Sequence, residues 1–102
     1  MRFKDASLGF QSLKPQLVLA LVVLDGVFKD NDSELVITSI NDARHSTTSL
    51  HYDGAAVDIR SRNIPDKEFL LKKCKEALGY SPDFDMILEF DHYHLEYQPK
   101  RR

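Results

Sequence analysis

The sequence is organised around one decapeptide, residues 49–58, which reads SLHYDGAAVD. It contains His51 and Asp58, with six residues between them that include a glycine and two alanines. Imidazole and carboxylate groups both bind transition metals, and small residues let the backbone pass close to a neighbouring group. We therefore interpret this stretch as half of a metal site. The other half is expected in residues 91–94, which read Asp-His-Tyr-His.

The end of the decapeptide has the alternation of a β-strand, in which successive side chains point to opposite faces. One face of the strand would carry the apolar residues Ala55, Val57 and Ile59. The opposite face would carry Ala56, Asp58 and Arg60. The pattern predicts that Asp58 points away from the core and toward a site.

Periodicity and turn residues predict the remaining elements on either side of this strand. They are a helix over about residues 14–29, which Pro15 opens with Ser12 as a possible cap, strands at 35–40, 84–90 and 92–97, and a second helix that Pro65 opens and Gly79 ends. The order is helix, strand, strand, helix, strand, strand. It predicts an α+β domain in which two helices pack on a small, mainly antiparallel sheet. We expect the first helix to be largely buried, and residues 1–12 to form an arm anchored by Phe3, Leu8 and Phe10.

Length and composition predict one domain, residues 1–102, with a single hydrophobic core. The net charge of −2 provides no global positive field that would recruit nucleic acid. The apolar run at residues 17–23 is shorter than the roughly 20 residues of a membrane span, and its surroundings do not resemble a signal peptide. The localisation therefore stays open, and any export would need help from elsewhere. The lone cysteine, Cys74, is expected to be a half-buried core thiol.

All four histidines lie in the two regions already singled out: His45, His51, His92 and His94. Residues two apart on a strand share a face, so His92, His94 and Glu96 are expected on one side of the last strand. A catalytic zinc takes three protein ligands and leaves a fourth position for water. His51, Asp58 and one of the last two histidines supply that number, and this donor set suits zinc better than calcium or magnesium.

Two motifs in these regions resemble a known superfamily. Ser49, His51, Gly54, Ala56 and Asp58 match the S-x-H-x-x-G-x-A-x-D signature of the zinc D-alanyl-D-alanine carboxypeptidases and endopeptidases, which include bacterial cell-wall enzymes and phage endolysins. Residues 91–96 are similar to the second signature, which carries D-x-x-H and H-x-H. With residues 37–39 and Arg44, the resemblance covers about residues 13–98.

The resemblance implies a division of labour among these residues. His51, Asp58 and His94 would bind one Zn²⁺ ion, Asp91 would activate the attacking water, and His92 would assist beside the metal. Asp91 can reach the water only if the chain bends near residues 90–92, because residues three apart on a straight strand point to opposite faces. Without that bend, His92 is the better base.

Three further residues take supporting roles under the same resemblance. Arg44 stands where relatives often have an arginine that could polarise the scissile carbonyl or hold a terminal carboxylate, although an ordinary exposed loop arginine is an open alternative. His45 and Ser49 would orient the site through hydrogen bonds. Residues 41–48 lack an aromatic-arginine element that some relatives have, and the chain is shorter than many of them, so it is most similar to the compact phage type.

The sequence thus predicts a monomeric zinc metallopeptidase that hydrolyses an amide bond in peptidoglycan stem peptides, as a carboxypeptidase or an endopeptidase. The main alternative is a zinc-stabilised binding module of the same fold that does not catalyse. A third possibility is a structural domain in which the histidines are incidental. The presence of both Asp91 and His92 favours the enzyme.

Overall fold

The computed structural model describes residues 1–5, 8–10, 13–41 and 55–99 of the chain. In these ranges the elements, in chain order, are β1 (Arg2–Phe3), α1 (Pro15–Asp30), β2 (Val36–Asn41), β3 (Ala56–Arg60), α2 (Lys67–Ala77), β4 (Phe84–Leu88) and β5 (His92–Tyr97). The strands form one sheet in the order β1-β2-β3-β5-β4. Only the short β1–β2 pair is parallel. The predicted α+β fold with a small, mainly antiparallel sheet is confirmed.

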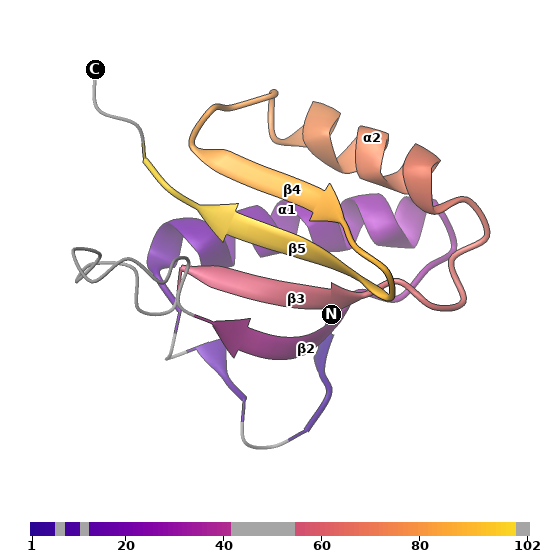
Figure 1. The fold of residues 1–102 in the computed structure, drawn as a ribbon, viewed down its shortest axis with the longest axis horizontal. Coiled ribbons are helices and arrows are strands. Elements are labelled where there is room, and N and C mark those ends of the chain that lie inside the picture. The colour runs from indigo at the N-terminus through magenta and orange to yellow at the C-terminus, as the bar shows by residue number, and fades with distance from the viewer. Residues whose placement is uncertain (6–7, 11–12, 42–54, 100–102) are drawn as a thin grey trace.

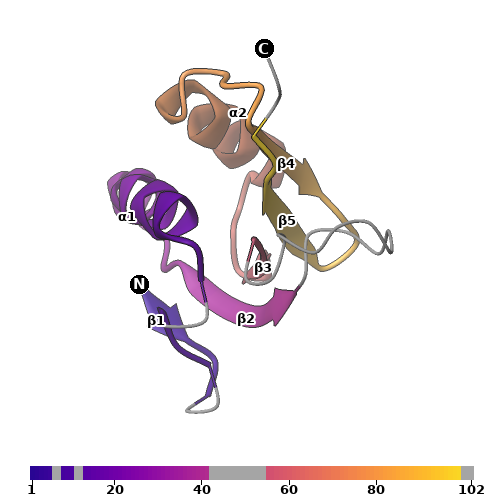
Figure 2. The same ribbon diagram turned by 90° about the vertical axis from the view of Figure 1, so that its left-hand side faces the viewer.

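Both helices lie on the same side of the sheet, and no helix of the described ranges covers the opposite side (Figures 1 and 2). The core therefore fills the space between the helices and one sheet face, to which β3 and β5 contribute Val57, Ile59, Tyr93 and Leu95, all fully buried. The Tyr93 hydroxyl donates a 2.8 Å hydrogen bond to the Lys67 carbonyl and so joins this face to the start of α2. The second face is left for polar side chains.

Helix α1 begins at Pro15, as predicted, because proline fits the first turn of a helix. Leu17, Leu21, Leu24 and Phe28 form its fully buried side. The prediction that the whole helix is largely buried is wrong, because Leu19, Val22 and Val23 are between 46% and 67% exposed. Only the side of α1 that faces the core is buried. The apolar residues on its other side remain exposed.

Helix α2 begins two residues later than the sequence indicated. Asp66 is its N-cap, and the carboxylate accepts a 3.0 Å hydrogen bond from the backbone N–H of Phe69. Pro65 therefore precedes the helix. Gly79 ends it with φ of 68°, a left-handed conformation that favours glycine. Cys74, on the inner side, is fully buried.

Strand β1 was not predicted. It extends the sheet beyond β2 through hydrogen bonds from the N–H of Arg2 to the Leu35 carbonyl (2.9 Å) and from the N–H of Lys4 to the Ile37 carbonyl (2.8 Å). The predicted anchoring of the N-terminal arm is confirmed. Phe3 and Leu8 pack against the core, and the rings of Phe10 and Phe3 pack edge to face with their centroids 4.8 Å apart. In the parts of the chain that the structure describes, neither helix is long and apolar enough to span a membrane.

Candidate metal centre

The histidines of β5 lie on the open face of the sheet. In the pairing of β3 with β5, Asp58 stands directly opposite His94 and Arg60 opposite His92. These four side chains are partly exposed, whereas Tyr93 and Leu95, which alternate with the two histidines along β5, are fully buried. The predicted alternation is therefore confirmed, and it brings Asp58 and His94 together.

Asp58 and His94 are in direct contact. The Oδ1 atom of Asp58 lies 2.9 Å from Nδ1 of His94. The other carboxylate oxygen, Oδ2, accepts a 2.7 Å hydrogen bond from the hydroxyl of Ser39 on β2. Both oxygens of Asp58 are thus held, which fixes the plane of the carboxylate.

Ser39 reaches Asp58 because of an irregularity in β2. Ile37 pairs with Ile59, but the next pair is Ser39 with Asp58, so Thr38 is an extra residue on the β2 side. A bulge of this kind moves the following side chain to the opposite face. Ile37 consequently points into the core while Ser39 points to the open face.

The second nitrogen of His94 also has a carboxylate partner. Nε2 lies 2.9 Å from Oε1 of Glu96, which is two residues further along β5 and shares its face. Gln98 in turn donates a hydrogen bond from Nε2 to the other oxygen of Glu96. Burial lowers the pKa of His94, but the hydrogen bonds to Asp58 and Glu96 outweigh it, so the pKa is raised overall.

His92 stands between three carboxylates. Its Nδ1 is 2.8 Å from Oδ1 of Asp91, and its Nε2 is 2.8 Å from Oε1 of Glu89 and 3.5 Å from Oδ1 of Asp58. The hydrogen bond to Asp91 is the largest influence on the pKa of His92, which is raised with help from Asp58 and Glu89. His92 therefore links the Asp58–His94 pair to the acidic residues before β5.

The chain bends between β4 and β5, at the predicted base Asp91. Strand β4 ends at Leu88, two residues earlier than predicted, and residues 89–91 form a tight connection to β5. It is closed by a 2.8 Å hydrogen bond from the N–H of Glu89 to the carbonyl of His92. The bend near residues 90–92 on which Asp91 depends is present, and it also delivers Glu89, which the sequence did not single out.

Four of the residues predicted for the site lie outside the described residues: the ligand His51, the substrate-binding Arg44, and the orienting His45 and Ser49. Of the three predicted ligands, the structure therefore places Asp58 and His94. Within residues 1–5, 8–10, 13–41 and 55–99, no group of three His, Cys, Asp or Glu side chains is arranged to hold a metal ion. The third predicted ligand, His51, lies outside those ranges.

The distance between the two predicted ligands, Asp58 and His94, can be compared with the donor spacing of a zinc site. Two donors bound at 2.0–2.1 Å in a tetrahedral site lie about 3.3 Å apart. The 2.9 Å between Asp58 Oδ1 and His94 Nδ1 is close to this separation, so a small relaxation would admit an ion between them. Glu96 on the far nitrogen of His94 is the outer partner that metal-binding histidines usually have, because it fixes the orientation of the ring.

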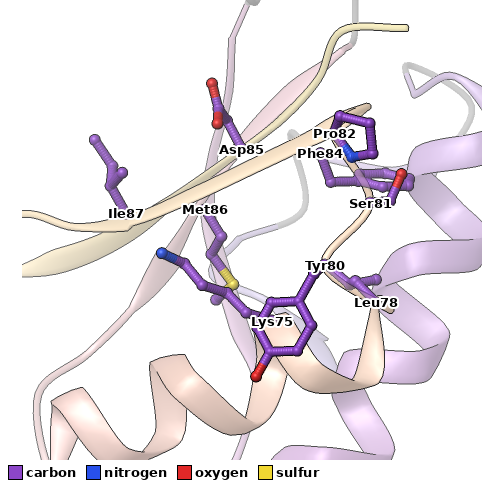
Figure 3. Close-up of a pocket in the computed structure, with 9 residues that line it drawn as sticks. All are labelled: Lys75, Leu78, Tyr80, Ser81, Pro82, Phe84, Asp85, Met86 and Ile87. Atoms are coloured by element: carbon purple, nitrogen blue, oxygen red, sulfur yellow. The ribbon is translucent and has the colours of Figure 1, made fainter. Parts of the chain in front are cut away.

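A polar pocket of about 390 Å³ opens beside this pair, with Asp58, Asp91 and His92 in its wall. A second pocket of about 250 Å³ lies between α2 and β4 and has no histidine in its wall. Figure 3 shows Met86, Lys75 and Tyr80 gathered on the helix side of β4, while Asp85 and Ile87 project from the other side. Of these two pockets in the described part of the chain, the first adjoins candidate catalytic groups and the second does not.

No family model matches the sequence, and no curated protein sequence matches it at a significant level.

Proposed function

We propose that the protein is a zinc metallopeptidase that hydrolyses an amide bond in peptidoglycan stem peptides, as a carboxypeptidase or endopeptidase. The observation that supports this most is the contact of Asp58 with His94, 2.9 Å apart on the open sheet face, within the two motifs that resemble the zinc peptidase superfamily. Both residues are about one-fifth exposed, so a substrate can reach them.

In this proposal His51, Asp58 and His94 hold the ion. Zinc, when bound, supplies a Lewis acid that polarises a carbonyl and brings the pKa of water near neutrality. Ser39 keeps the carboxylate of Asp58 in place, and Glu96 keeps the ring of His94 in place. A site whose donors are already oriented loses little free energy in rearrangement when the ion or substrate arrives.

Asp91 acts as the general base. Its side chain is 74% exposed, borders the polar pocket and contacts His92, so it can take a proton from the attacking water and pass it to the leaving amine. His92 assists beside the metal in this proposal, because its Nε2 is 3.5 Å from Asp58 Oδ1 and so borders the ligand pair. Glu89 is a second carboxylate in contact with the imidazole ring of His92.

The test is digestion of purified peptidoglycan with the zinc-loaded protein, followed by mass analysis of the released fragments. We expect stem-peptide fragments that disappear with a chelator and return with added zinc. His94→Ala and Asp58→Asn should abolish release, whereas Glu76→Gln, an exposed substitution on α2, should not. Undiminished release by His94→Ala would overturn the proposal.

The base is tested with Asp91→Asn and Glu89→Gln under the same conditions. We expect Asp91→Asn to lower the rate by at least about 100-fold, the usual contribution of a general base, and Glu89→Gln to have the smaller effect. If a double Asp91→Ala, His92→Ala variant keeps the full biological effect, the zinc-stabilised binding module is the better description.

A further inference from the structure

The polar pocket beside Asp58 and His92 carries three cations in its wall, Lys4, Arg60 and Arg62. They come from neighbouring parts of the sheet: Lys4 follows β1, Arg60 ends β3, and Arg62 lies in the turn after β3. Lys4 is hydrogen-bonded through its backbone to Ile37, next to the bulge at Thr38. The pocket thus extends over the open face from β1 to the start of β5.

These cations are not neutralised within the described parts of the chain, where no ion pair or side-chain hydrogen bond joins Lys4, Arg60 or Arg62 to a carboxylate. The hydrogen bond from Arg2, at 3.0 Å, is the largest influence that lowers the pKa of Glu34, and the charge of Arg60 makes the smallest contribution. The wall thus holds three cations together with two carboxylates, Asp58 and Asp91, in a protein whose net charge is −2. Cationic side chains that no carboxylate pairs attract anions to their side of the pocket.

The distance along β3 places Arg60 close to the candidate catalytic groups. Arg60 is two residues beyond Asp58 on the same face of β3, so their Cα atoms are about 7 Å apart at 3.3–3.4 Å per residue. An extended peptide also advances about 3.3–3.6 Å per residue. A substrate carboxylate one or two residues from an amide at Asp58 and His94 would therefore lie within reach of the guanidinium groups, which bind carboxylates through paired hydrogen bonds.

We propose that Arg60 and Arg62, with Lys4 beside them, form a carboxylate-binding subsite that selects peptides with a free carboxylate one or two residues from the scissile amide. This proposal rests on the proposed peptidase function. The carboxylate has two possible sources: the C-terminus of the peptide, as in carboxypeptidase action, or a carboxylate within the chain, as in endopeptidase action. In either case the subsite determines where along the stem peptide the amide is cut.

The test compares three synthetic stem peptides with the zinc-loaded protein: one with all carboxylates free, one with a C-terminal amide, and one with its internal carboxylates amidated. We expect amidation of the recognised carboxylate to lower kcat/KM by roughly 10- to 100-fold, the value of a charged hydrogen bond. The Arg60→Gln, Arg62→Gln double variant should show no such preference, through a higher KM for the free acid. Arg2→Gln is the matched control, and it should keep the preference.

The two proposals fail differently. If the wild-type protein cleaves all three peptides and the double variant discriminates among them as the wild type does, the subsite is overturned and the peptidase stands. If the zinc-loaded wild type cleaves none, the peptidase is overturned, and calorimetric binding of the free-acid peptide decides the subsite. Weaker binding to the double variant than to Arg2→Gln supports the subsite, whereas equal binding overturns it. Circular dichroism shows whether each variant keeps its fold.

Discussion

Glu96 gives His94 a defined orientation, since the two ring nitrogens of His94 face different carboxylates. Nε2 lies against Glu96 and Nδ1 against Asp58, at 2.9 Å each. When Nε2–H donates to Glu96, the lone pair of Nδ1 is directed toward Asp58, where the ion is proposed to bind. Outer partners of this kind commonly change metal affinity by 10- to 100-fold.

Glu96→Gln should therefore weaken zinc binding by about 10- to 100-fold while the fold is retained. The amide keeps the size of the side chain but removes the charge that strengthens the hydrogen bond to the ring. Competition with a chromogenic chelator measures the affinity. Glu76→Gln, on the exposed side of α2, is the control and should bind zinc as the wild type does. Equal affinities for the two variants would show that Glu96 does not support the ion.

Cys74 is predicted to be unreactive in the folded protein. The residue is fully buried, and burial raises the pKa of its thiol to about 12, so almost no thiolate exists at neutral pH. A thiol reagent such as Ellman's reagent should modify it slowly in native buffer and fully in denaturant. Rapid modification of the native protein would mean that this side of α2 opens readily.

For single residues, the sequence predicted which sheet face a side chain lies on wherever that face follows from the alternation of a strand. Asp58, His94 and Glu96 follow the period of two, and all three face the open side. Ser39 could not be predicted, because its contact with Asp58 depends on the bulge at Thr38, which is a property of the pairing of two strands. Glu89 likewise depends on the exact length of a turn.

At the scale of elements, the N-cap of α2 should contribute measurably to stability. Asp66 satisfies the N–H of Phe69, which would otherwise have no partner within the helix. Asp66→Ala should lower the free energy of unfolding by about 1 kcal/mol, whereas Asp66→Asn, which can also cap, should change it by much less. Urea denaturation of both variants measures the difference. Equal losses would contradict a capping role.

Helix α1 allows a test of which side carries the core. Leu21 is fully buried and Leu19 is 67% exposed, two residues away on the same helix. Leu21→Ala should cost about 2–5 kcal/mol because it removes packed atoms and leaves a cavity, whereas Leu19→Ala should cost less than about 0.5 kcal/mol. Thermal or urea unfolding would show the contrast. Similar losses would mean that the exposed side of α1 is covered in solution.

The elements long enough to show a period were predicted well, whereas β1 was missed and β4 was predicted two residues too long. Helix α1 and strand β5 carry enough residues to show their periods, and both lie within a residue of the predicted bounds. Strand β1 has two residues, too few for any period, and it forms because β2 offers an edge far along the chain. Strand β4 ends at Leu88, before its predicted end, because the chain turns after it and the N–H of Glu89 donates a hydrogen bond to the carbonyl of His92.

For the whole molecule, the layered arrangement separates stability from the proposed chemistry. The helices lie on one side of the sheet (Figures 1 and 2), and the core fills the space between them and that sheet face. Asp58, His92 and His94 lie on the other face. Substitutions on the open face therefore remove few buried apolar contacts. The variants proposed for the site should fold, so a loss of zinc or activity in them reports on the site itself.

The zinc content of the purified protein tests the central claim most directly. After incubation with zinc and dialysis, elemental mass spectrometry should find one zinc per wild-type chain and almost none in an Asp58→Ala, His94→Ala double variant whose circular dichroism matches the wild type. A wild-type protein that retains no zinc, or a double variant that retains as much as the wild type, would contradict a metal centre at Asp58 and His94.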